Sequence, residues 1–146
     1  MKNDFVHLHL HSQYSLLDGA IKFDELFEEV SKQGMSAVAL TDHGNLFGAY
    51  DFYKLGKKNN VKPIIGCEVY ITKDRTKKTP ENNKTHHLTV LCMNLKGYEN
   101  LCSLVSMGHL EGFYRKPRID RELLFEKSEG LIVLSGCLNS EVCHNI

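Results

Sequence analysis

The sequence lacks the features of several common protein classes. Its formal net charge is zero over 146 residues, so overall charge indicates neither a nucleic acid, nor a membrane, nor an acidic partner. No apolar run approaches the roughly 20 residues that a membrane helix needs. The N-terminus enters an expected strand directly and has no signal-peptide core. We therefore expect a cytoplasmic protein with no membrane partner.

Motifs of several well-known sites are also missing. Neither G-x-x-x-x-G-K-[ST] nor G-x-G-x-x-G occurs, and G-x-S-x-G is absent, so no phosphate-binding glycine loop or serine nucleophile is indicated. The five cysteines are an odd number and contain no C-x-x-C pair. Reduced, mostly buried thiols in a reducing compartment are expected for four of them: Cys67, Cys92, Cys102 and Cys143.

Apolar periodicity predicts alternating strands and helices. Strands are expected at 5–11, 37–40, 63–71, 87–93 and 131–134. Helices are expected from Phe23 to a stop at Gly34 and at 46–58, 98–107 and 120–126, with a polar loop at 72–84. This order is typical of one α/β domain with a parallel sheet and crossover helices.

Three histidines alternate near the N-terminus, at His7, His9 and His11. Side chains two apart on a strand share a face, so the three imidazoles would lie together. Neutral imidazole is the commonest metal ligand, and the pattern therefore predicts a cation site. An exposed strand face with no bound metal would show the same pattern.

Further possible ligands stand near the ends of the other expected strands, where α/β proteins gather their active groups. They are Asp18, Asp42, His43, Glu68, His86, His87 and Cys137. His86 and His87 fit this rule less well, because they begin their strand. Glu68 lies in an apolar run, and a buried carboxylate needs a partner.

Nitrogen, carboxylate and thiolate donors together suit zinc, or manganese or iron where oxygens dominate. Several carboxylates among imidazoles indicate more than one divalent ion, and closely spaced ions can activate water and hold a phosphoryl group. The donors therefore predict a hydrolytic phosphoesterase. Asp42 is expected to orient an imidazole from outside the cluster. His109 and His144 are assigned structural or surface roles, and Arg115–Arg118 a solvated turn.

Several motifs resemble those of the PHP (polymerase and histidinol phosphatase) superfamily. They are His9-Leu10-His11-Ser12, Thr41-Asp42-His43, Glu68, His87 and Ser135-Gly136-Cys137. The longer phrases at 7–19, 41–49, 62–68, 97–101, 116–120 and 129–137 resemble the PHP domain that opens the alpha subunits of bacterial DNA polymerase III. The resemblance covers nearly the whole chain.

The resemblance implies a distorted (β/α)₇ barrel of TIM-like type with a cluster of up to three divalent ions at its mouth. Carried onto this sequence, the ligands are His9, His11, Asp18, His43, Glu68, His87 and Cys137. His7 then becomes a neighbour of the cluster and not a ligand. Residues 1–146 would hold about the first five βα units. The remaining strands, a further Asp-x-His motif and the polymerase palm, fingers and thumb are expected outside this chain.

Three functions remain open at this point. The first is a metal-dependent phosphoesterase or 3′–5′ exonuclease domain within a replicative DNA-directed DNA polymerase. Its partners would be DNA and replicase subunits such as the clamp and a proofreading subunit. The second is a catalytically silent metal-binding scaffold that supports the polymerase or docks the proofreading subunit. The third, a stand-alone histidinol-phosphatase-like enzyme, is disfavoured by the polymerase-like phrases.

Overall fold

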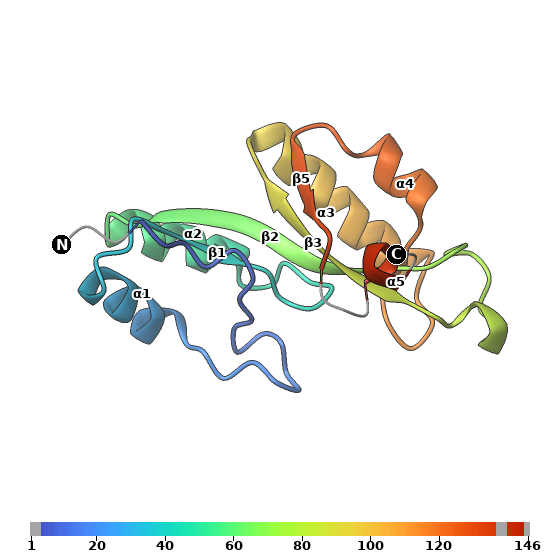
Figure 1. Cartoon of the computed structure of the whole chain (residues 1–146), viewed down its shortest axis with the longest axis horizontal. Helices are drawn as coiled ribbons and strands as arrows, with labels where there is room; N and C mark the ends of the chain where they lie inside the picture. Colours follow the sequence, from blue (N-terminus) through green and yellow to red (C-terminus); the bar gives the residue numbers. More distant parts are fainter. Residues whose placement is uncertain (1–3, 137–139, 145–146) are drawn as a thin grey trace.

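The computed structural model describes residues 4–136 and 140–144 (Figure 1). The strands are β1 (Ala37–Leu40), β2 (Lys62–Ile71), β3 (His86–Cys92), β4 (Arg118–Ile119) and β5 (Leu131–Leu134). The helices are α1 (Phe23–Lys32), α2 (Ala49–Lys58), α3 (Leu95–Leu110), α4 (Arg121–Glu126) and α5 (Glu141–His144), with a 3₁₀ turn at Pro80–Asn82. The described residues therefore form a mixed α/β fold.

The long strand β2 connects the two halves of the fold (Figure 1). Lys62–Ile65 of β2 pair in parallel with β1, and Gly66–Ile71 pair antiparallel with β3. The end of β2 also pairs in parallel with β4, and β5 pairs antiparallel with β3. The sheet order is β1-β2-β3-β5, with β4 beside β2.

The expected all-parallel sheet is wrong, because β3 runs opposite to the other four strands. The segment between β2 and β3 is polar and holds only the short Pro80–Asn82 turn. Without a crossover helix, the chain returns as an antiparallel neighbour. The start of β3 consequently lies beside the end of β2, with His87 paired with Tyr70.

Two apolar clusters lie at the two ends of β2. Helix α1 forms as expected and buries Phe23, Leu26, Phe27 and Val30, which occupy one face at helical spacing. This face packs with β1 and α2 in the first cluster. The second cluster joins β2 and β3 to α3 and α4. Burial on both sides fixes β2 between the two clusters.

Specific side chains determine where three of the helices start. Helix α2 starts three residues later than expected, because the Asn45 side chain accepts a hydrogen bond from Phe47 N and holds the preceding turn. Helix α3 starts three residues earlier, since Asn94 caps it at Gly97 N. Asp120 caps α4 at Leu123 N, as the sequence predicts.

The segment expected as a strand at 5–11 runs beside β1 without regular pairing. The His7 carbonyl accepts a hydrogen bond from Ala39 N, and the Leu10 carbonyl accepts one from Thr41 N. The N-terminal segment thus advances three residues between these bonds while β1 advances two. The extra residue breaks the alternation of side chains. The three histidines are therefore not equivalent.

Strand β5 was expected to be buried, but Ile132 and Val133 are 45% and 42% exposed. β5 is the last strand of the sheet and pairs only with β3 among the described residues, so part of its surface stays uncovered. Of the cysteines in the described segments, Cys67 is buried, Cys92 and Cys102 are partly buried, and Cys143 is exposed, all unpaired. No described helix is long and apolar enough to cross a bilayer.

Arg118, expected in a solvated turn, is fully buried. Its guanidinium donates four hydrogen bonds to backbone carbonyls: those of Gly112, Asn82, Arg75 and Lys77. Burial lowers the pKa of this group, and the carbonyl dipoles offset part of the cost of removing the cation from water. Arg118 thereby holds the polar loop between β2 and β3 against the end of α3.

Candidate metal centre

Glu68 lies at the centre of a cluster of histidines. It stands in the middle of β2, and its side chain is only 4% exposed. His43 continues the register of β1 beside it, because Glu68 N donates to the Asp42 carbonyl and Gly44 N donates to the Glu68 carbonyl. The carboxylate thus lies at the edge of the sheet where β1 ends, called the rim below. The sequence predicted possible ligands at the carboxyl ends of strands.

Four imidazoles approach the two carboxylate oxygens of Glu68. His9 Nε2 lies 2.6 Å and His11 Nε2 3.6 Å from Oε2. His43 Nδ1 lies 2.8 Å and His87 Nδ1 2.9 Å from Oε1. The side chains come from the N-terminal segment, the end of β1 and the start of β3, so the fold brings together residues that are far apart in sequence.

His87 reaches the centre because β3 is antiparallel. The sequence placed this histidine at the start of a strand, which is the wrong end for a parallel sheet. With β3 reversed, its start lies at the same rim as the ends of β1 and β2. The start of β3 is therefore a suitable place for a ligand, and the His87 imidazole lies within hydrogen-bonding distance of Glu68.

Asp18 joins the cluster through His43. Its carboxylate Oδ2 lies 3.0 Å from His43 Nε2. This hydrogen bond is the main cause that lowers the pKa of the exposed Asp18 carboxyl. The loop returns closely, because Gln13 N donates to the Ile21 carbonyl and a side chain at Gly19 would collide with the carbonyl of Ser12. Asp18 is thereby held over the rim.

The buried Asp42 does not contact an imidazole as expected. Its carboxylate accepts hydrogen bonds from the backbone N–H and the hydroxyl of Ser12 and from the hydroxyl of Ser15. Ser15 Oγ in turn accepts from His43 N. Asp42 therefore fixes the loop that carries Asp18, and it orients His43 through the backbone and not through a ring nitrogen.

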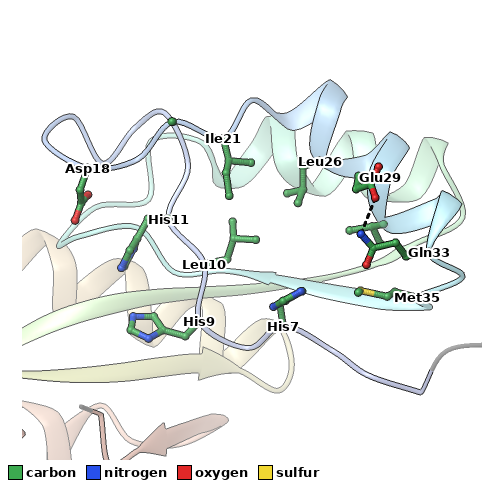
Figure 2. A pocket seen from close by; sticks show the side chains of 12 residues that line it. His7, His9, Leu10, His11, Asp18, Ile21, Leu26, Glu29, Gln33 and Met35 are labelled. Carbon is green, nitrogen blue, oxygen red and sulfur yellow. Dashed lines mark hydrogen bonds between the residues drawn. The ribbon is translucent and has the colours of Figure 1, made fainter. Parts of the chain in front are cut away.

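His7 lies apart from the cluster. It is exposed, and its ring packs edge-on against Phe5 at 4.8 Å. Figure 2 shows its side chain on the Met35 side of a hollow of about 520 Å³, whereas His9, His11 and Asp18 line the other part. The hollow gives a bound molecule access to the cluster from the α1 side.

His11 has the electrostatics of a neutral ligand. Burial lowers its pKa, and the nearby His43 lowers it further. The two rings stack with centroids 4.0 Å apart. The charge of Glu68 raises the pKa of His11, and the Thr41 carbonyl does so more weakly; the buried Nδ1 makes no hydrogen bond of ordinary geometry with any described residue. A neutral imidazole leaves a nitrogen lone pair available to a cation.

Two other sulfur and nitrogen groups near the centre have structural roles. The Cys67 thiol donates to the Asp42 carbonyl at 3.4 Å, and burial raises its pKa, so it stays protonated. His109 on α3 lies 2.9 Å from the Gly44 carbonyl oxygen and ties the turn after β1 to that helix. The structural role expected for His109 is consistent with this contact. Cys137, a predicted ligand, lies outside the described residues.

Tyr70 was missed by the sequence analysis. It is two residues after Glu68 on β2 and therefore shares its face, a signal that the strand period already contained. Its ring lies 5.0 Å from that of His87. Burial, and then the charge of Glu68, raise the pKa of its hydroxyl to about 12, so the phenol stays neutral.

The nitrogens of His9 and His11 and an oxygen of Glu68 all lie within 4.8 Å of one another. The PHP domain family matches residues 7–146 of this chain. The chain belongs to the PHP domain family. This membership covers all the residues that meet at the centre.

Relatives of this PHP domain include DNA polymerase III alpha subunits. It is 53% identical over 146 residues to that of Aquifex aeolicus, covering 94% of this chain and 13% of the relative. It is 51% identical over 142 residues to that of Helicobacter pylori strain 26695, covering 97% of this chain and 12% of the relative. The chain thus spans about an eighth of the length of these relatives.

A solved structure shares the fold. An amidohydrolase from Chromobacterium violaceum, with sulfate bound and no metal, aligns with a TM-score of 0.51 at 21% identity. The alignment covers 71% of this chain and 33% of that one. The described part of this chain therefore shares its mixed α/β fold with part of a larger protein.

The stability of the metal-free protein is expected to fall as the pH drops from about 7.5 to about 5.5. Burial lowers the pKa of both His11 and His87 below the ordinary 6.5. Below that pH the unfolded chain binds more protons than the folded chain, so the free energy of unfolding decreases. Urea unfolding in the presence of a chelator measures this. His11→Asn should flatten the pH dependence, and an unchanged slope in this variant would contradict the assignment.

Proposed function

We propose that this domain binds divalent cations around Glu68 and uses them to hydrolyse phosphodiesters. The observation that carries the proposal is the approach of four imidazoles to one buried carboxylate. The proposed ligands are His9, His11, Asp18, His43, Glu68, His87 and Cys137. Their mixture of nitrogen, oxygen and sulfur suits zinc, manganese or iron.

His43 supports a cation at this place. Its Nδ1 faces Glu68 and its Nε2 faces Asp18, at 2.8 and 3.0 Å. A neutral imidazole has one N–H and one lone pair, so without a positive charge at the site one of the two contacts sets a lone pair against a carboxylate. A divalent ion between nitrogen and oxygen donors removes this conflict. The donor set therefore fits a metal centre.

Bound ions would supply Lewis acidity and a water of lowered pKa for attack on phosphorus. The residues of the chain fix the geometry of that reaction. Glu68 is held in β2 and cannot shift without breaking strand pairing on both sides. Asp42 holds the loop of Asp18, and the hollow beside α1 admits a substrate to His9 and His11 (Figure 2).

We propose further that the domain serves within a replicative DNA polymerase in the cytoplasm. The similarity to DNA polymerase III alpha subunits over nearly the whole chain supports this. The substrate would then be a DNA 3′ end, and replicase subunits such as the clamp and a proofreading subunit would be partners. We also propose that the described strands belong to a distorted (β/α)₇ barrel, whose rim carries the metal centre.

Glu68→Gln tests the proposal in the full-length protein. The amide keeps the shape of the side chain but removes its charge, so metal affinity should fall by at least about tenfold and metal-dependent 3′–5′ hydrolysis should be lost. Metal analysis and an exonuclease assay measure the two effects. Glu28→Gln, which changes an exposed glutamate of α1 outside the lining of the hollow, is the matched control and should change neither.

Each possible result has a distinct meaning. A wild-type protein that binds metal but hydrolyses nothing would favour the scaffold role. A wild-type protein that carries no metal after loading would refute the centre itself. Loss of both metal and hydrolysis in Glu68→Gln, with Glu28→Gln unchanged, would support the proposed function.

A further inference from the structure

The turn between α3 and β4 brings a lysine to the edge of the metal centre. The Lys116 ammonium lies 4.5 Å from the centroid of the Tyr70 ring. That ring packs edge-on against His87 at 5.0 Å. Lys116 thus stands one aromatic ring away from a proposed ligand.

The backbone of this turn is fixed at several points. Tyr114 N donates to the Lys116 carbonyl, and the fully buried Arg118 anchors the following strand. Pro117 packs so closely on Gly44 that a side chain at Gly44 would meet its ring at 2.7 Å. Gly44 directly follows His43, so the turn rests on the same rim as the metal centre.

The charge of Lys116 is not matched by a carboxylate. Its ammonium forms no ion pair within the described residues and rests on the Tyr70 face, while other cations pair with acids, among them Lys77 with Asp74 and Arg121 with Glu141. Divalent ions held at His87 and Glu68 would repel this ammonium. An anion between the two positive charges would be attracted by both.

We infer that Lys116 binds an oxygen of the substrate phosphate seated on the metal centre. The inference rests on the proposed function and adds a specificity-determining residue to it. The face of the Tyr70 ring attracts the Lys116 ammonium, and this cation–π interaction holds the lysine in place without neutralising its charge. The lysine would therefore strengthen phosphate binding and leave metal binding to the other residues.

The test uses Lys116→Met in the full-length protein, because methionine keeps an apolar stem on Tyr70 but removes the charge. Calorimetric titration of the manganese-loaded protein with inorganic phosphate should show roughly 5- to 20-fold weaker binding, with the metal content unchanged. For a single-stranded oligonucleotide, KM should rise by a similar factor with kcat within about twofold. A plot of the logarithm of the oligonucleotide association constant against the logarithm of the salt concentration should become shallower, with the magnitude of its slope about 0.7 smaller.

Two variants make the test specific. Lys116→Arg keeps the cation and should restore phosphate affinity to within about threefold. Lys57 also lies over a tyrosine ring, that of Tyr53, but it stands in the last turn of α2, near the start of β2 and away from the rim. Lys57→Met is therefore the matched control and should leave both measurements unchanged.

The possible outcomes separate this inference from the proposed function. Unchanged phosphate affinity and salt slope in Lys116→Met would overturn the role of Lys116, even if the wild-type protein hydrolyses DNA. Weaker phosphate binding in a protein that binds metal without hydrolysis would support Lys116 and refute the phosphoesterase. Loss of metal from Lys116→Met would show a structural role and would also overturn the inference.

Discussion

The double variant His9→Ala, His11→Ala is expected to lose bound metal. Both nitrogens lie near the same oxygen of Glu68, so the variant removes two donors from one side of the centre. Replacing a residue that only supports a ligand costs about 10- to 100-fold in affinity, so the loss of two ligands should exceed about 100-fold. Metal analysis after dialysis measures it.

His7→Ala is the control for this double variant. It removes an imidazole from the same segment, but His7 is exposed and contacts Phe5 instead of Glu68. Its metal content should equal that of the wild-type protein. If the domain serves within a polymerase, as proposed, and the palm lies outside residues 1–146, as expected, nucleotide incorporation by the full-length double variant should persist. Unchanged metal in the double variant would exclude these histidines as ligands.

Arg118→Met is expected to destabilise the loop between β2 and β3 by about 3 kcal/mol. The substitution removes all four hydrogen bonds, and the partly buried carbonyls of Arg75 and Lys77 lose the Arg118 donor, whereas the Asn82 carbonyl still accepts from the Thr72 hydroxyl. Local opening should become on the order of 100-fold more frequent. Hydrogen–deuterium exchange of peptides from 72–84 measures this directly in the full-length protein.

Arg115→Met serves as the comparison within the same turn. Arg115 is exposed, and its backbone φ of 62° is equally accessible to either side chain. Exchange in 72–84 should therefore match the wild-type protein, since surface substitutions of this kind change stability by less than about 0.5 kcal/mol. Equal exchange in the two variants would mean that Arg118 does not hold the loop.

Local sequence signals predicted the elements with strong periodicity or a clear cap. The face of α1 follows from Phe23, Leu26, Phe27 and Val30, and the start of α4 follows from Asp120. Such signals depend on neighbours within a few residues, which the sequence displays. They do not contain the direction of a strand, and β3 was therefore assigned to a parallel sheet.

Long-range partners account for the remaining differences. Arg118 stands in a basic run that is typical of solvent, and only the folded chain surrounds it with carbonyls. Asp42 was expected beside an imidazole, but Ser12 and Ser15 occupy its oxygens from a loop some 30 residues away. No pattern within either segment indicates that pairing.

The candidate site was more predictable than the sheet around it. Glu68 in an apolar run signals a buried charge with partners, and histidines at three separate segments supply them. Tyr70 could have been added from its position on the same strand face. Lys116 could not, because its approach to the rim depends on the turn that Pro117 and Arg118 hold.

The register of β2 has a consequence for motion at the centre. Glu68 is hydrogen-bonded through its backbone to Asp42 and Gly44 on one side and lies opposite Thr89 on the other, so it moves only with the whole sheet. Asp18 belongs to a surface loop, and its side chain is more than half exposed. An ion held mainly by Glu68 would keep a constant position, whereas one shared with Asp18 would follow the rotamer of that exposed side chain. Any change in the distance between the two carboxylates would thus arise at the Asp18 side chain.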